Sequence, residues 1–77
     1  MAEFKYEINH KLATLSENGD YETQVNVITY GDYGHPKLDI RKWNVAENKM
    51  AKGITLTKGE ALNLLKVLQE FEFDEID

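Results

Sequence analysis

The chain has no cysteine and only two histidines, His10 and His35. Disulfide bonds and thiolate metal sites are therefore excluded, and two imidazoles 25 positions apart without clustered carboxylates do not predict a structural zinc. A chain of 77 residues forms one domain and buries a limited fraction of its surface. We expect no cofactor, so association with another chain is the simplest way to complete the core.

Long apolar runs are also missing. No segment approaches the ~18 consecutive apolar residues of a membrane-spanning helix, so we expect no contact with a membrane. Residues 1–6 mix charged and apolar side chains, unlike the apolar stretch of a signal peptide. We therefore expect a cytoplasmic protein, which leaves association with the nucleoid open.

The distribution of charge matters more than its sum. A net charge of −5 argues at first against a nucleic-acid partner. However, five of the fourteen acidic residues lie in residues 70–77, and no Lys or Arg follows Lys66. The remaining residues hold nine acidic and nine basic side chains, and such a neutral body can present a basic face.

Four segments alternate apolar and polar residues, as half-buried strands do. An Asn18-Gly19 turn signal joins the first two into a predicted antiparallel hairpin, and the glycine-rich residues 31–36 form a second turn. A polar connection then leads to a short last strand. The predicted strands are 4–15, 21–30, 37–45 and 52–56.

At Thr57 the spacing of apolar residues changes from the alternation of a strand to that of a helix. Thr57 and Glu60 have the spacing of a capping box, which predicts the start of a helix over residues 58–71, followed by an acidic tail, 72–77. Apolar residues then recur at three- and four-residue spacings along one stripe. Additional apolar side chains widen this stripe beyond what one sheet needs, which predicts a second copy of the chain as a partner. The predicted dimer-interface residues are Leu62, Leu65, Val67 and Leu68.

These elements predict a single α+β domain over residues 1–77, with a four-stranded antiparallel β-meander and one C-terminal amphipathic helix. In the third strand, Leu38 and Ile40 alternate with charged residues, and the only tryptophan, Trp43, ends the pattern. By parity, Trp43 shares a face with Asp39 and Arg41, although a bulge would reverse that assignment. The apolar face is expected to belong to the core.

The charged face of the third strand has two interpretations. Cations beside aromatic rings suit a single-stranded nucleic acid, because phosphates meet the cations and bases stack on the rings, each stacked base contributing ~1–3 kcal/mol. The alternative is a solvated face with a weak Asp39–Arg41 ion pair, with Trp43 in the core. Gln24 and Asn26 either bond to base edges or form a solvated pair. The predicted nucleic-acid-binding residues are Lys5, Lys11, Tyr30, Tyr33, Lys37, Arg41, Trp43 and Lys52.

The motif Lys37-Leu38-Asp39-Ile40-Arg41 is followed by an aromatic, a polar loop, Lys52-Gly53-Ile54-Thr55-Leu56 and a capped leucine-rich helix. This order resembles the single-stranded-DNA-binding domain of the transcriptional positive cofactor four family, in particular its small bacterial single-domain members. The resemblance covers about residues 30–71. The loop after Trp43 is shorter than in the animal coactivator, and the regulatory arm of that coactivator is absent.

The resemblance implies a homodimer whose helices pack at the interface and whose curved sheets form channels for unpaired strands. It also implies contacts to the nucleic acid from Tyr33, Arg41, Trp43 and Lys52. The expected function is sequence-independent binding of single-stranded DNA, in an accessory role in transcription, replication or repair. Two alternatives stay open: a protein-interaction module that uses the same aromatic face, and binding of single-stranded RNA.

An enzyme is not expected. Ser16, His10 and Asp20 supply the residue types of a hydrolytic triad, but Ser16 adjoins a turn without a nucleophile elbow. No glycine-rich phosphate loop precedes the predicted helix. His10 and His35 are interpreted as a strand-face residue and a turn residue.

Overall fold

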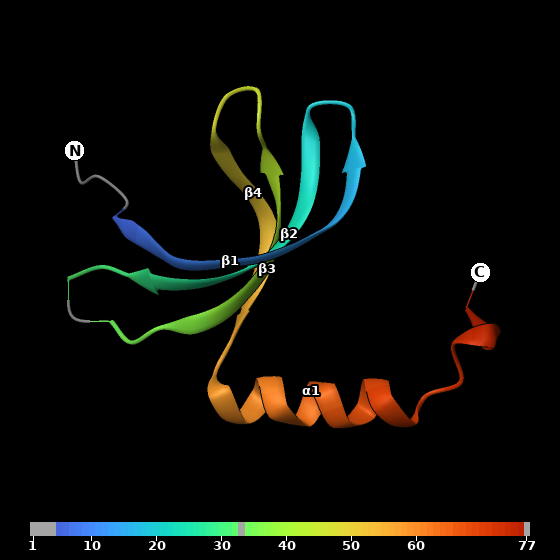
Figure 1. Ribbon diagram of the computed structural model, residues 1–77. Helices are drawn as coiled ribbons and strands as arrows, with labels where there is room; N and C mark the ends of the chain where they lie inside the picture. Colours follow the sequence, from blue (N-terminus) through green and yellow to red (C-terminus); the bar gives the residue numbers. More distant parts are fainter. Residues whose placement is uncertain (1–4, 33, 77) are drawn as a thin grey trace.

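The computed structural model describes residues 5–32 and 34–76 (Figure 1). Within these residues, four strands form one antiparallel sheet in the order β1-β2-β3-β4, and a helix follows. The predicted α+β fold, a four-stranded meander with one C-terminal helix, is therefore confirmed. The elements are β1 (Tyr6–Asn18), β2 (Tyr21–Tyr30), β3 (Lys37–Asn44), β4 (Lys49–Leu56), α1 (Lys58–Glu70) and the short 3-10 helix η1 (Phe73–Glu75).

Two strand boundaries lie three residues from their predicted positions. β1 continues to Asn18, beyond the predicted end at residue 15, because the turn is confined to Gly19, whose φ is 63°, and Asp20. β4 begins at Lys49 and not at residue 52, because residues 45–48 form a tight turn in which Asn48 adopts a φ of 54°. Short turns at both positions leave more of the chain for pairing.

Helix α1 begins where the capping box predicted. The amide of Glu60 donates to Thr57 Oγ1 at 3.2 Å, and the amide of Thr57 donates to Glu60 Oε1 at 2.9 Å. These reciprocal bonds satisfy two amides that the first turn would otherwise leave without partners. The predicted acidic tail after α1 contains a short turn of helix, η1.

Strand β1 is longer than its partner and is bulged. Its pairing with β2 slips after Ile8, after Lys11 and after Thr14, so strict alternation along β1 is lost. Bulges also bend a strand more strongly than regular pairing does. The residues of β1 that share one face are therefore Tyr6, Ile8, Lys11 and Thr14, which lie opposite Tyr30, Ile28, Asn26 and Gln24 respectively.

The sheet is folded over toward this face. Tyr6 pairs at one end of β2 with Tyr30, whereas Trp43 pairs at the other end with Glu22, eight residues or about 26 Å away along an extended strand. Nevertheless, the ring centroids of Tyr6 and Trp43 are 5.9 Å apart. Figure 1 shows the strands bending sharply near their middle. The side enclosed by this bend is called the concave face below.

The core lies on the concave face, which corrects the prediction that Leu38 and Ile40 mark the buried side. Both are only half-buried, on the opposite, convex face. The reason is that the sheet curls around its polar side, while α1 touches only β3 and β4 among the described elements and buries none of its own residues. The fully or nearly fully buried residues are Asn26, Ile28, Asp39 and Trp43.

Candidate nucleic-acid interface

A buried carboxylate organises the centre of the concave face. Asp39 has 0% exposure and accepts hydrogen bonds from Arg41 Nε at 2.6 Å and Arg41 Nη2 at 2.8 Å. It also accepts from the Tyr30 hydroxyl at 2.7 Å and from Thr55 Oγ1 at 3.0 Å. The Asp39–Arg41 pair is therefore an internal ion pair with neighbouring support, not the weak solvated pair that the sequence left open.

The pKa values of these groups follow from their contacts. Burial alone would raise the pKa of Asp39, but the hydrogen bonds from Arg41, Tyr30 and Thr55 outweigh it and hold the pKa below its ordinary value. The hydrogen bond to Asp39 raises the pKa of Arg41, and burial followed by the Asp39 contact raises the pKa of Tyr30. Asp39 and Arg41 are therefore both charged at neutral pH.

Arg41 keeps some binding capacity. Besides its two bonds to Asp39, its Nη1 donates to the carbonyl oxygen of Ala51 at 3.1 Å. A guanidinium has five N–H groups; three make these bonds and Tyr30 also forms a hydrogen bond with the group, so at most one N–H remains for a ligand. Because Asp39 fixes the plane of the group, Arg41 presents this donor in a set direction.

Strand β4 makes room for Arg41 by a bulge. Arg41 lies opposite Gly53, but Trp43 lies opposite Met50, so β4 carries the extra residue at this point. Gly53 lacks a Cβ, and one built there would collide with the Cβ of Arg41 and lie 2.6 Å from the carbonyl oxygen of Ile40. Lys52, a predicted contact residue, is exposed at this bulge.

Trp43 has the predicted face but not the predicted exposure. Trp43 lies on the same face of the sheet as Arg41, because Trp43 pairs with Glu22 of β2 and Arg41 pairs with Gln24 in unbroken register. However, Trp43 is only 4% exposed and packs edge to face against Tyr6. The prediction that Trp43 offers an exposed ring for base stacking is therefore wrong, because the sheet face that carries Trp43 is folded over. Among the described residues, its Nε1 has no hydrogen-bond partner.

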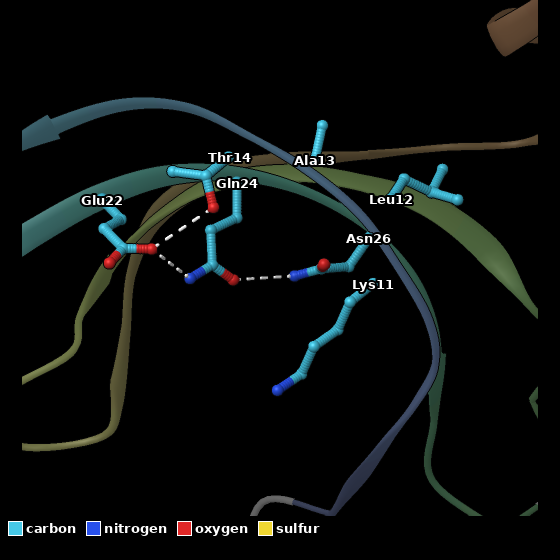
Figure 2. A pocket seen from close by; sticks show the side chains of 7 residues that line it. All are labelled: Lys11, Leu12, Ala13, Thr14, Glu22, Gln24 and Asn26. Carbon is cyan, nitrogen blue, oxygen red and sulfur yellow. Dashed lines mark hydrogen bonds between the residues drawn. The ribbon is translucent and has the colours of Figure 1, made fainter.

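A hollow of about 350 Å³ opens between the first two strands and is called the β1–β2 hollow (Figure 2). Figure 2 shows Lys11, Glu22, Gln24 and Asn26 extending to one side of the sheet, whereas Ala13 points away. Gln24 Nε2 donates to Glu22 Oε1 at 3.0 Å, and Asn26 Nδ2 donates to Gln24 Oε1 at 3.1 Å. The lining residues are Lys11, Leu12, Ala13, Thr14, Glu22, Gln24 and Asn26.

A second hollow, of about 460 Å³, is the β3–β4 hollow, lined by Tyr6, Arg41, Asn48, Lys49 and Met50. An aromatic ring beside two cations suits a base together with its phosphate. Lys49 is itself in a surface ion pair with Glu47, at 3.4 Å, which exchanges readily with solvent and competing anions. A third hollow, of about 340 Å³, lies beside the Lys5–Asp32 ion pair.

The structure brings together Lys11, Tyr30, Arg41 and Trp43 from the predicted set, all on the concave face. Lys37 has the same register as Arg41, opposite Ile28, at the end of β3 from which its charge reaches Glu60 at the start of α1. There it adds to the hydrogen bonds with Thr57 that lower the pKa of Glu60. Lys5 pairs with Asp32 at the sheet margin. Tyr33 lies outside the described residues.

Sequence reasoning missed Tyr6, Glu22 and Lys49 as parts of this face. Tyr6 lies in the first predicted strand, but its approach to Trp43 depends on the bend of the sheet. Glu22 alternates in phase with Gln24 and Asn26 along the second predicted strand, and a carboxylate beside two amides was the available signal. Lys49 was assigned to a loop and lies instead in β4.

Within residues 5–32 and 34–76, no group of three or more His, Asp or Glu side chains is arranged to hold a metal ion. No helix in the same residues is long and apolar enough to cross a membrane.

Comparison with known proteins gives one relationship. No established protein-family profile matches the chain. An uncharacterized protein of Treponema pallidum (strain Nichols) is 35% identical over 74 residues, a match that covers 94% of this chain and 85% of the treponemal protein. Identity at this level over nearly the whole of both chains indicates common descent and a shared fold. The chain therefore belongs to the same family as this treponemal protein.

Proposed function

We propose that the protein binds single-stranded DNA with little sequence preference, as a homodimer, through its concave face. The observation that carries this proposal is the gathering of an oriented guanidinium, Arg41, an aromatic ring, Tyr6, and an unpaired cation, Lys11, around two hollows of a curved sheet. Among the described residues, Lys11 makes no salt bridge. Rings and cations that follow a groove are what flexible single strands require.

The two hollows have different roles in this proposal. In the β3–β4 hollow, a base stacks against Tyr6 while its phosphate meets Lys49 and the remaining N–H of Arg41. In the β1–β2 hollow, Lys11 provides the second phosphate or base contact. Trp43 supports the ring of Tyr6 from inside and does not itself meet the strand.

Dimerisation is proposed because the described chain leaves a large apolar area uncovered. In α1, Leu65 is 50% exposed and Val67 60% exposed, and the convex face of the sheet is only half-buried. Exposed apolar surface on this scale is typical of an interface. A second copy offers a matching apolar helix and sheet, so a two-fold arrangement covers both copies at once. The proposed interface residues are Leu62, Leu65, Val67 and Leu68.

The proposed role is that of an accessory factor in transcription, replication or repair within the cytoplasm, without catalysis. The sequence resemblance to the positive cofactor four family supports this role, as does a groove built from binding groups. In the described residues, serine and histidine side chains are absent from the two hollows that this proposal uses.

A fluorescently labelled oligothymidine tests the proposal. Titration of the intact protein at low salt is expected to give saturable binding at micromolar or lower protein, and competition with an RNA oligonucleotide of matched sequence separates DNA from RNA preference. Absence of binding at micromolar protein in low salt would overturn the proposal. In that case, a protein-interaction module becomes the better interpretation of the same face.

A further inference from the structure

The two oxygens of the buried Asp39 carboxylate are held unequally. Among the described residues, Oδ1 accepts from Arg41 Nε alone, at 2.6 Å. Oδ2 accepts from Arg41 Nη2 at 2.8 Å, from the Tyr30 hydroxyl at 2.7 Å and from Thr55 Oγ1 at 3.0 Å. These three donors come from β3, β2 and β4 respectively, so Oδ2 is tied to the strands on both sides of its own.

The register of the sheet brings Thr55 to this carboxylate. Thr55 lies directly opposite Asp39 in the pairing of β3 with β4, and side chains that are opposite each other share one face of the sheet. The Thr55 hydroxyl therefore reaches Asp39 from β4, while the Tyr30 hydroxyl reaches it from β2. Because Asp39 is fully buried, turning its carboxylate would break hydrogen bonds that water cannot replace.

The orientation of the carboxylate determines that of Arg41. A guanidinium that makes two parallel bonds to a carboxylate has a fixed geometry relative to it, and the bond from Nη1 to the Ala51 carbonyl oxygen adds a third point. A freely moving arginine would lose side-chain freedom when a ligand binds, and this loss weakens binding. Arg41 has already lost that freedom on folding, so it lines the β3–β4 hollow in an ordered state.

Neither Thr55 nor Tyr30 lines any of the three hollows described above, so neither has a place at the proposed base and phosphate contacts. We infer that Thr55 and Tyr30 are positioning residues of the proposed nucleic-acid site, which raise its affinity by holding Asp39 and, through it, Arg41. The inference rests on the proposed function. It gives Tyr30 an indirect role in place of the predicted direct contact, and it adds Thr55, which the sequence did not single out.

The test begins with titrations of labelled oligothymidine at fixed salt. Thr55→Val removes the hydroxyl and is expected to weaken binding about threefold, within the range that ordering one long side chain costs. Thr55→Ser keeps the hydroxyl and should restore wild-type affinity. Thr29→Val is the matched control, because the Thr29 hydroxyl also donates a hydrogen bond, to Asn9 Oδ1 at 2.7 Å, and lies away from Arg41. Its affinity should equal that of the wild type.

A double-mutant cycle separates positioning from a general loss of structure. In the variant Asp39→Asn, Arg41→Met, the buried pair is absent, so adding Thr55→Val should not weaken binding further. Lys11→Ala, in contrast, should reduce affinity by the same factor in this background and in the wild type, because Lys11 is not part of the network.

Circular dichroism confirms that each variant is folded at the temperature of the titration. If Thr55→Val is not, Tyr30→Phe removes the other hydroxyl and must give the same loss of affinity. Wild-type affinity in the folded hydroxyl variants, an equal loss in Thr29→Val, or an equal loss after removal of the buried pair would overturn the inference while the proposed function stands. Failure of the wild-type protein to bind oligothymidine would remove both.

Discussion

The rings of Tyr6 and Trp43 meet edge to face with their centroids 5.9 Å apart and their planes at 60°, although the two residues belong to opposite ends of the sheet. This contact closes the bend over the concave face. The two rings have different roles: Trp43 is buried in the core, whereas Tyr6 lines the β3–β4 hollow. The shape of the proposed interface therefore depends on a core contact.

The Trp43→Ala variant tests the structural role of this contact. Removing a buried tryptophan is expected to lower the free energy of unfolding by about 3–5 kcal/mol, because the cavity cannot close around a curved sheet. Urea denaturation followed by circular dichroism measures the change. Tyr21→Ala is the matched control, since Tyr21 is 44% exposed, and its effect should be small. A loss below about 1 kcal/mol at Trp43 would contradict the burial.

Asp39→Asn tests the buried ion pair. The variant leaves Arg41 charged without its carboxylate, and breaking one side of such a pair is expected to cost about 3–5 kcal/mol of unfolding free energy. Denaturant midpoints of the wild type and the variant give the difference. The double variant Asp39→Asn, Arg41→Met should recover part of the loss, because it removes the unpaired charge. If the single and double variants are equally unstable, the pair is not the origin of the effect.

The lowered pKa of Asp39 predicts a specific acid sensitivity. A carboxyl whose pKa is lower in the folded state stabilises the protein at any pH above its unfolded value, 3.8. This contribution decreases as the pH falls below that value and is lost once the pH passes the folded pKa. Urea midpoints measured from neutral pH down to roughly pH 3 should therefore fall less steeply in Asp39→Asn than in the wild type. Parallel curves would contradict the assignment.

The local features of the fold were predictable from sequence. Thr57 and Glu60 form a capping box through contacts three residues apart, so α1 began where the pattern indicated. The turn at Gly19 was also visible, because a positive φ favours glycine. The four strands and their order follow from alternation and short connections, both of which are properties of neighbouring residues.

The faces of the sheet were harder to predict, because they depend on pairing between distant residues. The bulges in β1 move Lys11 to the side of Asn26, which alternation alone places elsewhere. Parity gave the correct face for Trp43, but its burial follows from the bend that brings Tyr6 over it. Asp39 alternates with apolar residues like any solvated side chain, so its burial was not evident in the sequence.

Leu65→Lys tests the proposed dimer. The wild-type chain is expected to sediment at about twice its 8.9 kDa mass, and a charge in the apolar stripe of α1 should shift the population to the monomer. Thr14→Lys, at an exposed position of β1 on the concave face and away from α1, adds the same charge and should leave the dimer intact. A wild-type protein that sediments as a stable monomer would contradict the two-fold interface.

Lys11→Ala tests whether this cation faces a phosphate. Each phosphate contact with a single strand adds about 0.7 to the steepness with which log affinity falls against log salt concentration. Lys11→Ala is therefore expected to reduce that slope by about this amount and to weaken oligothymidine binding most strongly at low salt. Lys66→Ala, on α1, removes the same charge outside the concave face and should keep the wild-type slope. Because salt screens only the electrostatic part of binding, the affinities of Lys11→Ala and the wild type should converge as salt rises. A constant ratio of affinities across the salt series would mean that Lys11 contributes by packing or by a neutral hydrogen bond, and the phosphate contact would then be excluded.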